Sequence, residues 1–188
     1  MSEFDDTPAP ASGSRIFIAA LLIVAALAAG FALFVSRASF RSTTGALGPG
    51  EPAPPINAAG WLNGEPFADG ADGRVTFVHA WYTSCPHCRT GAPELRALYD
   101  RYRDRGVEFI GLTFEEQDQL AEIQDYVQDT GLLWPNGYGA GPTLRALGAS
   151  AYPFAWVIGP DGRVLWNSDS GSSPTEAIKL ALQSVRGT

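Results

Sequence analysis

The stretch that decides the fold is VTFVHAWYTSCPHCRTGAPEL, residues 75–95. Its first part, within Arg74–Tyr82, is rich in β-branched and aromatic residues, which is typical of a buried central strand. From Pro86 to Arg103 the larger apolar residues recur at spacings of three and four, which predicts a helix. The sequence Cys85-Pro-His-Cys88 therefore lies where a buried strand gives way to a helix.

This position predicts redox chemistry for the two cysteines. A helix N-terminus offers free backbone N–H groups and a partial positive charge, and both stabilise a thiolate. We therefore expect Cys85 to be the exposed nucleophile and Cys88, one turn into the helix, to resolve a mixed disulfide. Pro86 suits the first turn because it needs no partner for an N–H group. His87 adds a donor, or a cation when protonated, that lowers the pKa of the Cys85 thiol further.

The chain has two cysteines, and they are only three positions apart. A bridge that closes so short a loop contributes little to stability, so the pair is expected to serve chemistry. A structural zinc site needs four ligands, and the only soft donors are Cys85, Cys88, His79 and His87. The sequence favours redox chemistry over metal binding, and we expect no metal and no cofactor.

Strand and helix patterns alternate through the rest of the chain. A hairpin is predicted within Gly60–Gly73 because two short runs flank the turn dipeptide Asn63-Gly64. The other patterns predict strands at Val107–Phe114, Phe154–Ile158 and Arg163–Trp166, and helices at Asp118–Thr130 and Pro174–Val185. This order predicts an α/β fold with an N-terminal β-hairpin and a central mixed sheet that carries helices on both faces.

The N-terminal third divides into a tail, an apolar segment and a linker. Residues 1–15 are polar and rich in Pro, Ser and Ala, which predicts a disordered tail. Residues 16–35 carry no charge and are long enough for a helix to cross the ~30 Å hydrocarbon layer. A cleaved signal peptide has a shorter apolar stretch, and a soluble helix would have a polar face. We therefore predict one transmembrane anchor, followed by a Pro/Gly-rich linker at residues 36–55.

Charge gives little information on partners or orientation. The net charge is −7, and the basic residues form no stripe, which argues against a nucleic-acid partner. Arg15 precedes the apolar segment, while Arg37 and Arg41 follow it. The positive-inside rule therefore does not assign a side of the membrane to the C-terminal domain.

The run at residues 75–95 resembles the strand, motif and helix of the thioredoxin superfamily. The segment Ala151-Tyr152-Pro153-Phe154 resembles that superfamily's cis-proline loop. Together with the anchor, the Pro-rich linker and the leading hairpin, these features are most similar to the TlpA/ResA-like, cytochrome-c-biogenesis branch. The resemblance covers about residues 48–186. It implies a thioredoxin-like domain there, a redox-active Cys85–Cys88 disulfide and a cis peptide bond before Pro153.

The resemblance also implies a place and a reaction. Members of this branch act outside the cytoplasmic membrane, where they commonly reduce the haem-attachment thiols of apocytochromes c. It therefore implies a single-pass protein of the cell membrane, with its domain on the extracytoplasmic (periplasmic) side. Its partners would be protein disulfides, apocytochrome c among them, and a membrane thiol reductase as electron donor.

There are four alternatives to a reductant. The chain would be a disulfide oxidant or isomerase, a copper- or zinc-binding chaperone that uses Cys85, His87 and Cys88, or a non-catalytic partner. The retained cysteine pair counts against the last of these. A peroxidase is disfavoured because Thr83-Ser-Cys85 lacks the spacing of a peroxiredoxin site.

Several positions depart from the family pattern. Ser84 stands where a Trp usually precedes the first cysteine, and Gly91 where many members carry an acidic residue. His79 replaces a usual Asn or Asp. The CPHC motif resembles the strongly oxidising DsbA type. These departures leave the direction of electron flow open and predict a pair less reducing than cytoplasmic thioredoxin.

Other residues are candidates for supporting roles. His79 is either a core histidine or a base that accepts the proton of Cys88. The resemblance places Tyr152 and Pro153 against the substrate peptide, and Trp81 beside them as a shield of the active-site helix. Glu115 and Glu116 lie between a strand and a helix, where we expect them to favour the helix N-terminus.

Overall fold

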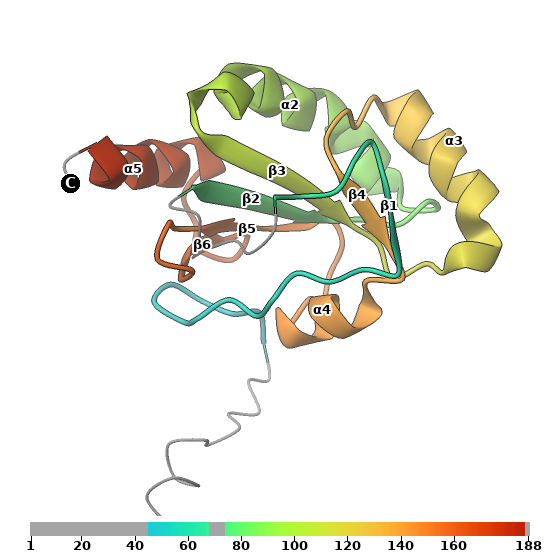
Figure 1. Cartoon of the computed structure of the whole chain (residues 1–188), viewed down its shortest axis with the longest axis horizontal. Coiled ribbons are helices and arrows are strands. Elements are labelled where there is room, and N and C mark those ends of the chain that lie inside the picture. Colours follow the sequence, from blue (N-terminus) through green and yellow to red (C-terminus); the bar gives the residue numbers. More distant parts are fainter. Residues whose placement is uncertain (1–44, 68–73, 187–188) are drawn as a thin grey trace, which may run out of the picture. The chain divides into compact units, whose positions relative to one another are not determined.

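The computed structural model describes residues 45–67 and 74–186 (Figure 1). Within them, six strands form one sheet in the order β1-β4-β3-β2-β5-β6. The strands are β1 (Gly60–Leu62), β2 (Val75–Ala80), β3 (Val107–Leu112), β4 (Asn136–Tyr138), β5 (Phe154–Ile158) and β6 (Val164–Asn167). Strand β2 lies at the centre with all six residues buried, as its composition predicts.

The sheet is mixed. Strand β3 runs parallel to β2 and to β4, whereas the β2–β5, β5–β6 and β1–β4 pairs are antiparallel. The β2–β3 register places His79 opposite Gly111 and Ala80 opposite Leu112. Because the two strands are parallel, the segments that follow them leave the same edge of the sheet. The cysteine motif follows β2 there, and Glu115 follows β3.

Helices cover both faces of the sheet. They are α2 (Pro86–Tyr102), α3 (Leu120–Thr130), α4 (Gly141–Ala146) and α5 (Pro174–Arg186), with 3₁₀ turns η1 (Arg103–Arg105) and η2 (Gln117–Gln119). In Figure 1, α2 and α5 lie on one side of the central strands and α4 on the other. This arrangement follows from the hydrophobic faces of the strands.

Alternate residues of the strands divide the core in two. Phe77 and Phe109 belong to a cluster that includes residues of α2, α3 and α5. Val78 and Ile110 point to the opposite face and join a cluster with α4 and with residues 46–58. Successive side chains of a strand point to opposite faces, so a strand between two helical layers is apolar throughout.

The predicted N-terminal hairpin is not formed by the described residues. Strand β1 pairs with β4, with Gly60 opposite Tyr138, and residues 65–67 are not a strand. The rest of the predicted second arm, residues 68–73, lies outside the described residues. The turn itself exists, since Asn63 and Gly64 have φ values of 61° and 95°. The turn dipeptide sets the local path of the chain, but it does not determine which strand pairs with β1.

Strand β4 and helix α4 were not predicted from the sequence. They contain three and six residues, which is too short for hydrophobic periodicity to show. Both are held by the backbone: Thr113 N–H donates to the Gly137 carbonyl oxygen, and Ala140 N–H to that of Thr113.

The N-terminal predictions are only partly within the described residues. The tail at 1–15 and the apolar segment at 16–35 lie outside them. Within residues 45–67 and 74–186, none of the helices combines the length and apolar character needed to cross a bilayer. The second half of the predicted linker packs as part of the domain, since Leu47, Gly50 and Ala53 donate backbone hydrogen bonds to Leu147, Val164 and Gly162.

Candidate redox site

Cys85 and Cys88 form a disulfide at the start of α2, as the resemblance implied. Cys85 is the N-cap residue, and Pro86 occupies the first turn. The Cys88 N–H donates to Cys85 Sγ over 3.0 Å. A donor aimed at this sulfur, at the positive end of a helix, stabilises negative charge on Cys85 once the bridge is reduced.

The exposure of the two cysteines differs from the prediction. Cys85 was expected to be the more exposed, yet the two residues are 2% and 3% exposed in this oxidised state. Both belong to the core cluster on the α2 side of the sheet. What distinguishes the two sulfurs here is the hydrogen bond to Cys85. Pro86 and His87 are the exposed members of the motif.

The cis-proline loop lies beside the motif. The Tyr152–Pro153 peptide bond is cis, as the resemblance implied. The Tyr152 ring is half-buried and packs against the rings of Tyr82 and Phe114, with centroids 5.4 and 5.6 Å away. Tyr82 and Phe114 are also in contact, and Phe114 is 43% exposed. An accessible aromatic surface therefore adjoins the segment just before the cysteines.

A cavity of about 480 Å³ adjoins Cys88 of the disulfide. His79, His87, Cys88, Gly91 and Pro153 are among its lining residues. The predicted proton acceptor and the predicted resolving cysteine thus face one space.

His79 is 5% exposed, and burial lowers its pKa to about 4. The imidazole is therefore neutral near pH 7, and its Nδ1 atom finds no hydrogen-bond partner among the described residues. Moving a proton to it from a thiol of ordinary pKa, about 8.5, costs about 6 kcal/mol. That cost falls only where the new thiolate and imidazolium pair with each other. The role of His79 as a base stays a prediction.

The assignment of Trp81 to the substrate surface is wrong for this structure. Trp81 is fully buried, and its ring stacks on Tyr126 of α3, with centroids 4.6 Å apart and planes at 8°. A side chain without exposed surface cannot contact a substrate. Its role is to pack the end of β2 against α3.

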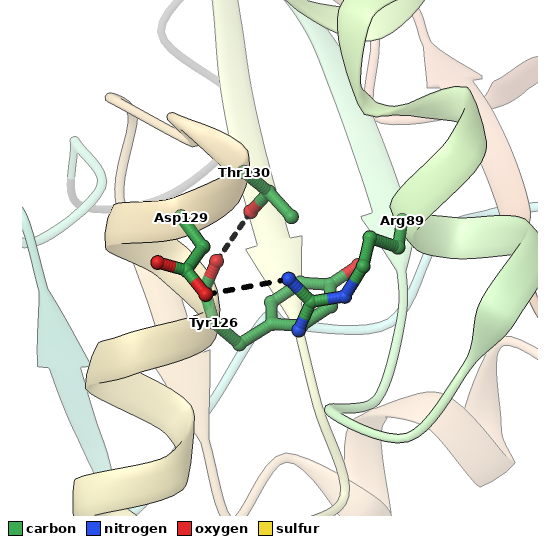
Figure 2. A network of polar contacts seen from close by, with 4 residues as sticks. All are labelled: Arg89, Tyr126, Asp129 and Thr130. Atoms are coloured by element: carbon green, nitrogen blue, oxygen red, sulfur yellow. Dashed lines mark hydrogen bonds and ion pairs between the residues drawn. The ribbon is translucent and has the colours of Figure 1, made fainter.

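The first turn of α2 is also connected to α3 (Figure 2). Arg89 follows Cys88, and its guanidinium carbon lies 4.9 Å from the ring centroid of Tyr126. The same group reaches Asp129 Oδ2 over 3.4 Å, although this pair is too exposed to contribute much. Thr130 Oγ1 donates to the Tyr126 carbonyl oxygen. Burial raises the pKa of the Tyr126 hydroxyl to about 12, with Arg89 opposing that shift and Glu115 adding to it.

Glu115 is the residue that the sequence misassigned. Glu116 is the N-cap residue of the η2 turn, although its side chain makes no cap hydrogen bond, whereas Glu115 lies one residue earlier and does not cap the turn. Glu115 is 4% exposed and accepts hydrogen bonds from Thr83 N–H, Thr83 Oγ1 and Thr113 Oγ1. Parallel pairing of β2 and β3 brings these residues together. In a single sequence, the only indication of this contact is the expectation that the two strands lie side by side.

Within the described ranges, no three His, Cys, Asp or Glu side chains converge as metal ligands. Both cysteine sulfurs are engaged in the disulfide.

Residues 49–167 match the AhpC/TSA family, which is more than half of the chain. The chain belongs to this family. Among its curated relatives is the thiol-disulfide oxidoreductase ResA of Bacillus anthracis, which is 30% identical over 94 residues. The matched region covers 50% of this chain and 53% of that protein, so the chain spans about half the length of the curated relatives it matches. The likeness to ResA confirms the resemblance read from the motifs.

Solved structures confirm the thioredoxin-like fold. A thiol-disulfide isomerase from Corynebacterium glutamicum is 19% identical, with a TM-score of 0.58 over 72% of this chain and 96% of its own. A thioredoxin-family thiol:disulfide interchange protein from Chlorobium tepidum TLS is 24% identical, with a TM-score of 0.57 over 70% and 97%. At these identities the likeness establishes the α/β fold with its mixed sheet.

Proposed function

We propose that this chain is a membrane-anchored thiol–disulfide oxidoreductase that reduces extracytoplasmic protein disulfides through Cys85 and Cys88. The observation that carries the proposal is the disulfide at the N-terminus of α2, with a backbone N–H directed at the Cys85 sulfur. A relative named as a thiol-disulfide oxidoreductase supports the reaction class.

The reaction begins from the reduced pair. The Cys85 thiolate attacks one sulfur of a substrate disulfide, which forms a mixed disulfide and releases the first substrate thiolate. Cys88 then loses its proton, and its sulfur attacks Cys85 Sγ. This step closes the Cys85–Cys88 bridge and releases the second substrate thiolate. The substrate gains two electrons, and the chain is oxidised to the state described above.

The chain's own groups favour this order of events. Cys85 carries the N–H bond and the N-cap position that stabilise a thiolate, whereas Cys88 lies inside the first turn. Cys88 also faces the cavity that His79 lines, so its proton can leave to water there or to the imidazole. Cys85 is accordingly the attacking residue, and Cys88 the resolving one.

The substrate is proposed to lie along the cis-proline loop. Pro153 is exposed next to the motif, and the rings of Tyr82, Phe114 and Tyr152 form the adjoining aromatic surface. An extended peptide beside Tyr152 would place its disulfide near Cys85. Haem-attachment cysteines of apocytochrome c are the substrate that the family resemblance favours.

The membrane setting rests on the sequence and the resemblance. The apolar segment at residues 16–35 has the length of a transmembrane anchor. A domain that reduces extracytoplasmic disulfides has to lie on the periplasmic side, and a membrane thiol reductase would return the two electrons.

A reporter enzyme active only in the periplasm, fused after Thr188, should be active. Activity of a cytoplasmic reporter at the same position would contradict this topology.

An oxidant is the second candidate function. Two observations favour it: His87 is exposed beside the disulfide, and Gly91 lines the cavity without adding an acidic group. A protonated His87 stabilises the Cys85 thiolate and with it the reduced form, which makes the disulfide a stronger oxidant.

Trapping of substrates tests the proposed mechanism. Cys88→Ser should accumulate a mixed disulfide between Cys85 and a partner protein, because nothing resolves it. Cys85→Ser is the matched control and should trap little. Equal trapping by both variants, or trapping by Cys85→Ser alone, would contradict the assignment of roles. The redox state of the trapped partner in cells lacking the chain distinguishes the reductant from the oxidant.

A further inference from the structure

Glu115 is a buried carboxylate that accepts hydrogen bonds from Thr83, just before the cysteine motif, and from Thr113. The Thr83 N–H lies 3.1 and 3.0 Å from its two oxygens, and Thr83 Oγ1 lies 2.5 Å from the first. Thr113 Oγ1 donates to the second oxygen over 2.8 Å. A carboxylate is an acceptor-only group, and these three donors match it.

The bonded residue Thr83 belongs to the turn that presents Cys85. Thr83 is two positions before Cys85, and the Cys85 N–H donates to the Tyr82 carbonyl oxygen at the start of that turn. Glu115 is anchored in turn, since its carbonyl oxygen accepts from Gly139 N–H over 2.7 Å. The segment before the nucleophile is therefore attached to the edge of the sheet through one carboxylate.

From these contacts we propose that Glu115 is a positioning residue that fixes the Thr83-Ser84 turn and opposes negative charge on Cys85. The inference rests on the proposed function, because it concerns the same thiol. The disulfide is neutral, whereas the reduced pair carries a thiolate in its reactive form. A fixed negative charge nearby therefore destabilises the reduced form relative to the oxidised one. Its effect is opposite to that of the helix N-terminus.

The charge of Glu115 also acts on another group at this end of the sheet. It adds to the burial that raises the pKa of Tyr126, the residue on which Trp81 stacks. The carboxylate thus acts on its surroundings through charge as well as through its hydrogen bonds. This chain has no acidic side chain at Gly91, and Glu115 supplies one beside the turn before Cys85.

The test compares Glu115→Gln with Glu116→Gln in the full-length chain. Glu115→Gln removes the charge and keeps an oxygen that can accept from the Thr83 N–H. Glu116 is its exposed neighbour, so Glu116→Gln is the matched control.

The readouts are the pKa of the Cys85 thiol, from thiolate absorbance, and the equilibrium with glutathione. We expect Glu115→Gln to lower that pKa by about one unit, a tenfold change worth ~30 mV towards a less negative potential. Glu116→Gln should change neither.

An unchanged or raised Cys85 pKa in Glu115→Gln, or an equal shift in Glu116→Gln, would overturn the proposal. Thr83→Val keeps the Glu115 carboxylate but removes the hydroxyl that donates a hydrogen bond to it. The negative charge of Glu115 is then less well neutralised, so this variant should raise the pKa of the Cys85 thiol. A fall in that variant would overturn the proposal even where Glu115→Gln does not fold. Failure of the wild-type pair to equilibrate with glutathione would instead contradict the proposed function.

Discussion

His79 should make the stability of this domain sensitive to mild acid. Its imidazole is buried, and burial lowers its pKa from 6.5 to about 4. Because the folded pKa lies below the unfolded one, the unfolded chain binds the proton first as the pH falls. The contribution of the neutral imidazole to the free energy of unfolding is fully present above pH 6.5. It is lost as the pH decreases from about 6.5 to about 4.

The size of the effect follows from the shift. The full difference between pKa values of 6.5 and about 4 corresponds to about 3 kcal/mol in the free energy of unfolding, and about 2.5 kcal/mol of it is lost by pH 4.5. Carboxyl groups also titrate in this range, so the prediction concerns the difference between wild type and a variant without the imidazole.

The assay is urea unfolding of the oxidised chain near pH 7.5 and near pH 4.5. His79→Asn should lose about 2.5 kcal/mol less than wild type between the two conditions. The other histidine of the chain, His87, is exposed, so His87→Asn is the matched control and should follow wild type. If His79→Asn loses as much stability as wild type, or His87→Asn loses as little as His79→Asn, the imidazole at position 79 is not the buried titrating group. An NMR titration of His79 in wild type gives the same answer independently.

Three further substitutions test individual features. His87→Pro should make the reduction potential more negative by tens of millivolts, since ~30 mV accompanies each unit of thiol pKa; a redox titration that shows no shift would contradict this. Gly91→Glu adds a side chain where a Cβ meets nothing within 4 Å. Its negative charge should make the reduction potential more negative in the same titration, and the loss of a helical glycine should raise the free energy of unfolding in urea by up to about 1 kcal/mol. Gly111→Ala would drive a Cβ into the Asn136 amide oxygen and should lower urea stability by about 1–3 kcal/mol.

Much of the fold could be predicted because its long elements carry clear patterns. The six-residue strand β2 and the seventeen-residue helix α2 are recognisable from composition and spacing alone. The same junction located the cysteine pair at a helix N-terminus. The three residues of β1 and of β4 carry no such pattern, and their pairing depends on tertiary contacts.

The site was less predictable than the motif at its centre. A sequence gives the residue type of Glu115 but not the parallel pairing that directs its carboxylate to Thr83. Because Glu115 lies just before a helix in the sequence, helix capping is the role that the sequence favours. For Trp81, proximity to the motif suggested a surface role, whereas stacking on Tyr126 buries it completely. In both cases a contact distant in sequence determines the role.

The Cys85–Cys88 bridge is proposed to serve electron exchange. Equilibration of the purified chain with glutathione mixtures, followed by alkylation and mass measurement, tests it most directly. We predict one two-electron transition at a potential less negative than about −270 mV, within the range of thioredoxin-like oxidoreductases. A bridge that is still closed at about −300 mV, as structural disulfides are, would contradict a role in electron exchange.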